Sequence, residues 1–154
     1  MLSNSTLTIN WLKPDLQEER WEFFSHPAKQ EWYRQQSVTW DRIESRFDSG
    51  RLVSYPRSAL IGEIPVALSY HSYGEYQIYL AKAKRGYRKN YSRMEDALQS
   101  AGTLTLQAPI ILAGAGAGLL FSGYRRLCLA WNYGMIPAVW LVSLGKNQGE
   151  EATA

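Results

Sequence analysis

The sequence contains little of the chemistry on which metal sites and disulfide frameworks depend. Its 154 residues include one cysteine, Cys128, and two histidines, His26 and His71. A single cysteine excludes an internal disulfide framework and a cysteine-based zinc cluster within one chain. The histidines form no His-x-His or His-Glu pair, so we expect no metal site built on them. Leucines on both sides of Cys128 predict a small buried apolar residue.

Targeting signals and long apolar runs are also missing. The first six residues have no basic start and lead into no long apolar stretch, so we expect a cytoplasmic protein. Residues 97–124 and 127–145 carry no charge, which raises the alternative of a membrane hairpin with Arg125 and Arg126 in its loop. Polar residues and prolines cut both runs into pieces of strand length, so we expect no membrane partner.

The charge is unevenly distributed along a chain whose length predicts one domain. Residues 1–48 hold six Lys/Arg and eight Asp/Glu, a net charge of −2. Residues 49–154 hold eleven Lys/Arg and six Asp/Glu, a net charge of +5. The second part is therefore the more favourable partner for a polyanion.

The first 50 residues predict a helical arm that packs on the rest of the domain. Residues 11–48 have helical spacing, with Pro27 between the first two pieces and a third piece from Thr39 to Gly50. Asp15 and Glu18 have the spacing of a capping box. Four of the six tryptophans precede residue 41. These rings either pack the arm onto the core or form a docking surface for another protein.

Residues 109–142 predict strand, tight turn, strand, helix and strand. The apolar run Pro109–Leu112 is bounded by proline and glycine, and a glycine-rich turn leads into Leu119–Ser122. Gly123 then ends the strand, and residues 124–133 have helical spacing up to Gly134, where a left-handed cap is expected. Residues 136–142 predict the last strand.

The turn at Gly123 is the main candidate site. A sharp bend there would present amide groups and the positive end of a helix dipole beside Tyr124, Arg125 and Arg126. Because a helix N-terminus favours anions, two arginines at that end predict a bound phosphate or an acidic partner. The alternative is two solvated arginines in a first turn.

This region resembles the ParB N-terminal-domain superfamily, which includes sulfiredoxin. The similarity rests on an ordered series: Gly102, Pro109-Ile-Ile-Leu112, Phe121-Ser-Gly-Tyr-Arg-Arg126, Ala130 and Gly134-Met-Ile-Pro-Ala-Val139. The resemblance implies an α+β (α/β) fold with a small mixed sheet and packed helices. It would span residues 51–145 as a stand-alone module of phage, plasmid or mobile-element type. Some members of the superfamily hydrolyse or transfer phosphate, some cut DNA and some only bind.

Two departures from the family pattern bear on function. Tyr124 stands where the family usually has an acidic residue, which puts a carboxylate role at that position in doubt. Sulfiredoxin-like members need a cysteine within the turn, whereas Cys128 lies inside the expected helix. We therefore set aside sulfinic-acid reductase activity.

The stretch from residue 51 to 70 predicts the entry to this domain. Residues 60–68 have strand-like apolar content, interrupted by Gly62 and Pro65. In related domains a residue of this region faces the phosphate turn, and Arg57 and Glu63 are the candidates here. An exposed loop charge is the alternative for Arg57.

A basic segment supplies the second functional signal. Cations alternate with tyrosines between residues 79 and 93, and no acid occurs from Lys82 to Arg93. The nucleic-acid-binding candidates are Lys82, Lys84, Arg85, Arg88, Lys89 and Arg93, because cations neutralise phosphates and tyrosines stack on bases. Gly86 predicts a break between a helix over residues 76–85 and a second helix capped by Ser92. The alternative is a solvated basic face.

These patterns predict a phosphate-recognising domain that acts on nucleic acid or a nucleoside triphosphate. Gly123, Tyr124, Arg125, Arg126 and Arg57 would bind phosphate, and Arg125, Arg126 and Glu63 are the candidate catalytic residues of a nuclease or nucleotide hydrolase. Mg²⁺ would accompany a nucleoside triphosphate. The alternative is a non-catalytic DNA-binding or protein–protein adaptor. Residues 146–154 predict a disordered tail.

Overall fold

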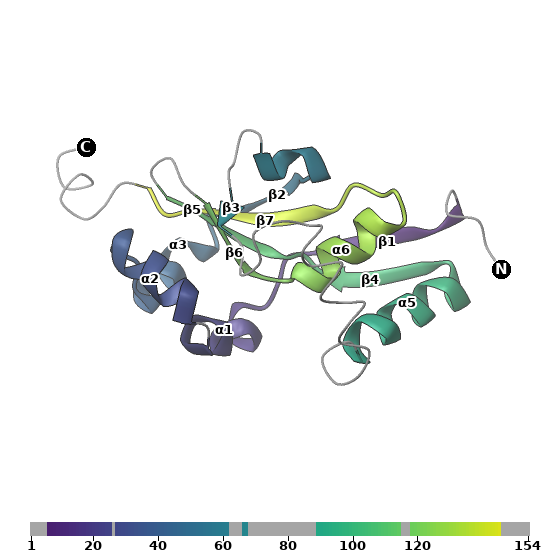
Figure 1. Cartoon of the computed structure of the whole chain (residues 1–154), viewed down its shortest axis with the longest axis horizontal. Coiled ribbons are helices and arrows are strands. Elements are labelled where there is room, and N and C mark those ends of the chain that lie inside the picture. The colour runs from purple at the N-terminus through teal and green to yellow at the C-terminus, as the bar shows by residue number, and fades with distance from the viewer. Residues whose placement is uncertain (1–5, 26, 62–65, 68–88, 115–117, 146–154) are drawn as a thin grey trace.

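The computed structural model describes residues 6–25, 27–61, 66–67, 89–114 and 118–145 (Figure 1). These residues form an α+β fold in which helices pack against a small mixed sheet, as the sequence predicts. In the arm the elements are β1 (Thr8–Leu12), the 3₁₀ helix η2 (Leu16–Glu19), α1 (Arg20–Ser25), α2 (Pro27–Gln35) and α3 (Trp40–Phe47). There follow β2 (Arg51–Ser54), the 3₁₀ helix η3 (Arg57–Ile61), β3 (Val66–Ala67), α5 (Lys89–Ala101), β4 (Thr103–Gln107), β5 (Ile110–Ala113), β6 (Gly118–Ser122), α6 (Tyr124–Asn132) and β7 (Ala138–Ser143).

Five strands form the larger sheet in the order β2-β7-β5-β6-β3. β5 and β6 pair as an antiparallel hairpin, while β7 runs parallel to β5 on its other side. The chain therefore leaves β6, passes through α6 and crosses β5 before it returns as β7. This crossover places the start of α6 at the end of β6.

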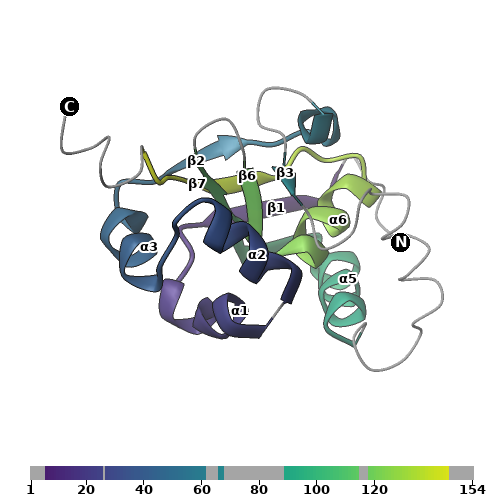
Figure 2. The same cartoon turned by 60° about the vertical axis from the view of Figure 1, so that its left-hand side comes forward.

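Alternating side chains of the central strands point to opposite faces of this sheet. Ile110 and Leu112 of β5 face the cluster that the arm covers, whereas Ile111 between them faces α6. The same alternation occurs on β6 and β7. Because both faces are buried, the central strands are apolar except at their ends, as the sequence predicts for β5 and β6. Figure 2 shows α1, α2 and α3 together on one side of the sheet and α6 with α5 at another.

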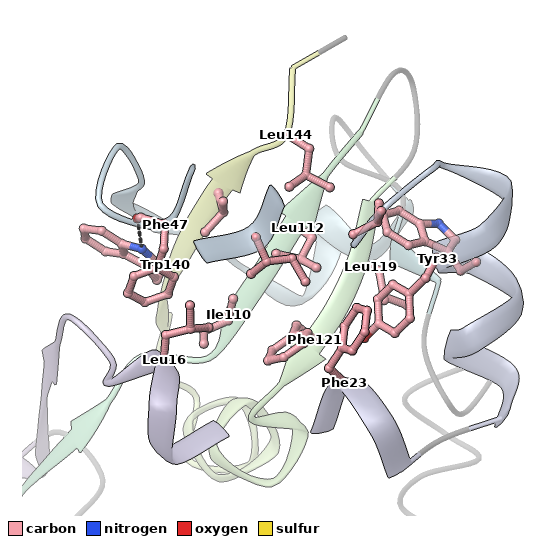
Figure 3. Packing of buried hydrophobic residues seen from close by; sticks show 14 of the residues in the cluster. Leu16, Phe23, Tyr33, Phe47, Ile110, Leu112, Leu119, Phe121, Trp140 and Leu144 are labelled. Atoms are coloured by element: carbon pink, nitrogen blue, oxygen red, sulfur yellow. Dashed lines mark hydrogen bonds between the residues drawn. The ribbon is translucent and has the colours of Figure 1, made fainter. Parts of the chain in front are cut away.

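Aromatic side chains dominate the packing between the arm and the sheet (Figure 3). The ring of Phe23 stacks on Tyr33 at 4.5 Å between centroids and meets Trp40 edge-on at 5.8 Å. Trp40 in turn lies 6.4 Å from Phe121 of β6. A fully buried phenylalanine or leucine stabilises a fold by about 1.5–3 kcal/mol, so this cluster fixes the arm on the sheet. Trp32 and Trp40 pack against the core, as one reading of the sequence predicts, while Trp21 is 56% exposed.

A second, two-stranded sheet joins the first strand of the chain to the middle of the sequence. β1 pairs in parallel with β4, from Thr8 opposite Thr103 to Leu12 opposite Gln107. Leu98 of α5 and Leu129 of α6 form a third buried cluster with Leu7, next to these strands. The expectation that residue 11 begins a helical stretch is wrong, because Trp11 and Leu12 belong to β1.

Three further details of the sequence prediction need correction. The Asp15 carboxylate caps η2 by accepting a hydrogen bond from the backbone N–H of Gln17 at 3.0 Å. Glu18 does not complete a capping box: its carboxylate accepts from Gln107 Nε2 at 3.1 Å, a side chain 89 positions away. Ser92 does not begin a helix, since α5 already starts at Lys89. Of the stretch predicted as a strand, residues 60 and 61 belong to the 3₁₀ helix η3 and residues 66 and 67 form β3; the other positions lie outside the described residues.

Several predictions fall outside the described residues. These are the helix over residues 76–85, the break at Gly86 and the tail at 146–154. Within the described ranges, no helix is both long and apolar enough to cross a membrane. The uncharged stretches that raised the hairpin alternative contain β4, β5, β6 and β7 instead.

Candidate functional site

Gly123 forms a sharp connection between β6 and α6. It is the N-cap of α6 and has φ = 98° and ψ = 21°, a left-handed conformation that favours glycine. A Cβ atom at this position would lie 2.6 Å from the Cβ of Pro109, closer than any normal contact. Glycine is therefore required here for both its backbone angle and its lack of a side chain, as the sequence predicts.

The first turn of α6 contains no acidic residue, and no side chain caps it by a hydrogen bond. It contains instead Tyr124, Arg125 and Arg126, all three partly buried. Tyr124 packs against the apolar cluster beneath α6, together with Leu127 and Trp131. The start of the helix thus combines a positive helix dipole with positive side chains, an arrangement that a nearby anion would stabilise.

Arg126 has partners within the protein. Its Nη1 donates to the backbone carbonyl of Gln107 at 2.6 Å, and its Nη2 donates to Glu19 Oε1 at 2.8 Å. The two side chains of this ion pair are 16% and 15% exposed. No local pattern in the sequence points to the pair, because its residues are 107 positions apart. In this structure Arg126 connects the arm to the turn, a role that the sequence did not predict for it.

Arg57, a predicted phosphate-binding residue, begins the 3₁₀ helix η3. Burial raises the pKa of the Cys128 thiol, and the charge of the Arg57 guanidinium acts in the opposite direction. Cys128 lies one helical turn after Tyr124. Ala59 of η3 packs against the same cluster as Tyr124. η3 therefore packs against the same cluster as the first turn of α6, and Arg57 at the start of η3 is exposed.

The basic segment enters the described structure where α5 begins. Tyr91 accepts a hydrogen bond from Asn132 Nδ2 at 2.6 Å, which holds the first turn of α5 against the end of α6. Burial raises the pKa of Tyr91 to about 12, although this hydrogen bond acts to lower it. Arg93 is exposed. The other cations, Lys82, Lys84, Arg85 and Arg88, and the candidate Glu63 lie outside the described residues.

A buried cation lies on the arm side of the same turn. Lys29 of α2 is 6% exposed, and its Nζ donates to the carbonyl of Phe121 at 2.9 Å and approaches Glu22 Oε2 at 3.4 Å. Burial lowers the pKa of Lys29, while Glu22 and then Glu19 act to raise it. Sequence reasoning missed this residue, whose position in an amphipathic helix resembles that of an ordinary surface lysine.

A cleft of about 300 Å³ lies elsewhere, between the link that follows β1 and the end of α3. It is lined by Lys13, Pro14, Asp15, Leu16, Gln17, Glu44, Phe47 and Asp48. Lys13 pairs with Asp48 at 2.6 Å. None of the predicted phosphate-binding residues lines this cleft.

The described residues contain no group of three or more His, Cys, Asp or Glu side chains placed to hold a metal ion. The Mg²⁺ proposed to accompany a nucleotide stays a prediction. Comparisons of the chain with protein-family models, curated proteins and solved structures gave no match. The resemblance to the ParB superfamily likewise stays a prediction.

Proposed function

We propose that the protein binds a phosphate polyanion, nucleic acid or a nucleotide, on the side of the domain formed by η3, α5 and α6. One observation supports this proposal: the described elements η3, α5 and α6 carry more cations than acids. These three elements contribute five cations and two acids, namely Arg57, Lys89, Arg93, Arg125 and Arg126 against Glu95 and Asp96.

The arm on the other side of the sheet has the opposite balance. The first turn of α6 adds the positive end of the helix dipole.

In this proposal the residues have distinct roles. Arg57 and Arg125 contact phosphate oxygens beside the Gly123 turn, and Arg93 with the preceding basic segment holds the rest of the backbone. Arg126 keeps the turn in place through Gln107 and Glu19. Binding is the activity that these positions support; a nuclease or nucleotide hydrolase would need, in addition, a base or nucleophile such as the candidate Glu63.

A double substitution tests the proposal. Arg57→Gln with Arg125→Gln should weaken binding of a labelled oligonucleotide by about tenfold or more, the effect of losing charge-assisted contacts worth about 1.4 kcal/mol or more. The measurement is fluorescence anisotropy at two salt concentrations. Arg34→Gln with Arg46→Gln, on the arm, removes the same charge and should change the affinity less than twofold. Equal effects of the two double variants would contradict the proposed site.

The second candidate function is a protein adaptor that works through the arm. Trp21 and Phe24 of α1 are 56% and 57% exposed, an unusual exposure for two large aromatic residues one turn apart. This candidate predicts that a binding partner contacts α1, whereas the phosphate proposal predicts contact at α6.

A further inference from the structure

Four charged side chains form a buried series between the arm and the Gly123 turn. Glu22 lies 3.4 Å from Lys29, and Glu19 lies 2.8 Å from Arg126. The charge of Glu19 also acts to raise the pKa of Lys29, against the effect of burial. All four side chains are at most 16% exposed. The acids come from η2 and α1, and the cations from α2 and α6.

The position of Glu19 is that of an anion at the start of α6. Arg126 Nη2 would lie 3.0 Å from a Cβ atom placed on Gly123, so this nitrogen lies directly over the turn. The carboxylate of Glu19 is bonded to that same nitrogen. Carboxylates and phosphates both form charge-assisted hydrogen bonds with a guanidinium group, and both are stabilised near a helix N-terminus.

Arg126 can exchange this partner without losing its own position. Its Nη1 stays bonded to the carbonyl of Gln107, and only Nη2 is committed to Glu19. Glu19 is the last residue of a four-residue 3₁₀ helix, and its Oε1 is the atom bonded to Nη2. A rotation of one side chain would therefore release Nη2.

We propose that Glu19 is a built-in competitor for phosphate, which occupies Arg126 until a polyanion displaces it. This inference rests on the proposed function and adds a regulatory contact to it. The arm then does more than cover the sheet, because its carboxylate sets the affinity of the α6 side for phosphate. Changes that draw Glu19 away from Arg126 strengthen binding.

Neutralising Glu19 tests this inference. Glu19→Gln should bind inorganic pyrophosphate about tenfold more tightly than the wild type by calorimetry, because the internal competitor is removed. Glu44→Gln is the matched control: it removes the same charge from an exposed position on α3 and should change the affinity less than twofold. An affinity of Glu19→Gln equal to or weaker than that of the wild type overturns the inference, as does an equal gain in Glu44→Gln.

A second measurement uses the wild type, in case Glu19→Gln does not fold. The side-chain N–H resonance of Arg126 should move when ¹⁵N-labelled protein is titrated with pyrophosphate, and it should saturate together with the Gly123 amide. Movement of the Arg57 and Arg125 resonances with a fixed Arg126 would overturn this inference and leave the proposed function standing. If the wild type binds neither pyrophosphate nor an oligonucleotide, both proposals fail.

Discussion

The two faces of the five-stranded sheet are covered in different ways. Three helices of the arm cover one face with aromatic rings and bury ion pairs at its edge. On the other face, α6 and η3 cover a smaller, largely aliphatic cluster that contains Leu120, Leu127 and Val139. Arg57 and Arg93, on the α6 side of the domain, remain exposed at the surface.

Charged side chains therefore have different roles on the two sides of the sheet. On the arm side, Lys29 contacts protein oxygens and contributes to the packing of α2 on β6. On the α6 side, Arg125 and Arg126 lie in the first turn of a helix whose N-cap provides no side-chain hydrogen bond, and Arg126 already holds one carboxylate, that of Glu19. The first arrangement stabilises the fold, whereas the second is suited to a ligand of opposite charge.

The largest expected effect on stability comes from replacing the buried lysine on the arm side. Lys29→Met would leave the Phe121 carbonyl and the Glu22 carboxylate without their cation, and removing one partner of a buried pair costs about 3–5 kcal/mol. The free energy of unfolding, measured with denaturant, should fall by that amount. Arg34→Met, on the same helix with a side chain that is 75% exposed, should change it by about 0.5 kcal/mol or less. Similar losses in the two variants would contradict a structural role for Lys29.

The next effect concerns the turn that both sides share. Gly123→Ala should lower the free energy of unfolding by about 3 kcal/mol, because alanine would adopt a left-handed backbone and collide with Pro109. Gly134 provides the control, since its φ is 71° but no atom lies within 4 Å of an added Cβ. Gly134→Ala should cost only about 1 kcal/mol. Equal costs would show that Pro109 does not restrict the turn.

The smallest effect is a dependence of folding stability on pH. Its sign is opposite for Lys29 on the arm side and Tyr91 on the α6 side. Burial lowers the pKa of Lys29 below its ordinary 10.5. Between the folded-state pKa and 10.5, the unfolded chain therefore holds more protons, and stability rises with pH. Burial raises the pKa of Tyr91 from 10.0 to about 12, so the folded protein holds more protons in that interval and stability falls with pH.

Denaturant titrations at several alkaline pH values measure both contributions. The stability of the wild type relative to Lys29→Met should increase as pH approaches 10.5 from below, while its stability relative to Tyr91→Phe should decrease from pH 10 to about 12. The same sign for both differences would mean that one of these groups is not buried as the structure shows.

The parts of the fold that local patterns could predict lie close together in sequence. The hairpin of β5 and β6, the bend at Gly123, helix α6 and the positive φ at Gly134 depend on neighbouring residues, and all occur where the sequence predicts them. The alternating sequence Thr-Leu-Thr-Leu-Gln of β4 is also a strand signal, although β4 was not predicted.

The parts that were missed depend on contacts between distant segments. β1 pairs with β4 across about 95 positions, as Thr8 opposite Thr103 illustrates, and no turn or hydrophobic period specifies such a pairing. Glu19 joins Arg126 in the same way, so the sequence showed which cations lie in the first turn of α6 but not which acid pairs with one of them. The partners of buried Lys29 include the Phe121 carbonyl of β6, which is 92 positions away in the sequence.

The central claim is that a polyanion binds on the α6 side and not on the arm. Chemical-shift mapping of ¹⁵N-labelled protein during titration with a single-stranded oligonucleotide tests it most directly. We predict that the amides of residues 123–128 and 91–93 shift, that higher salt weakens these shifts, and that residues 40–47 of α3 stay in place. Shifts confined to α1, α2 and α3, or no shift at any oligonucleotide concentration, would contradict the claim.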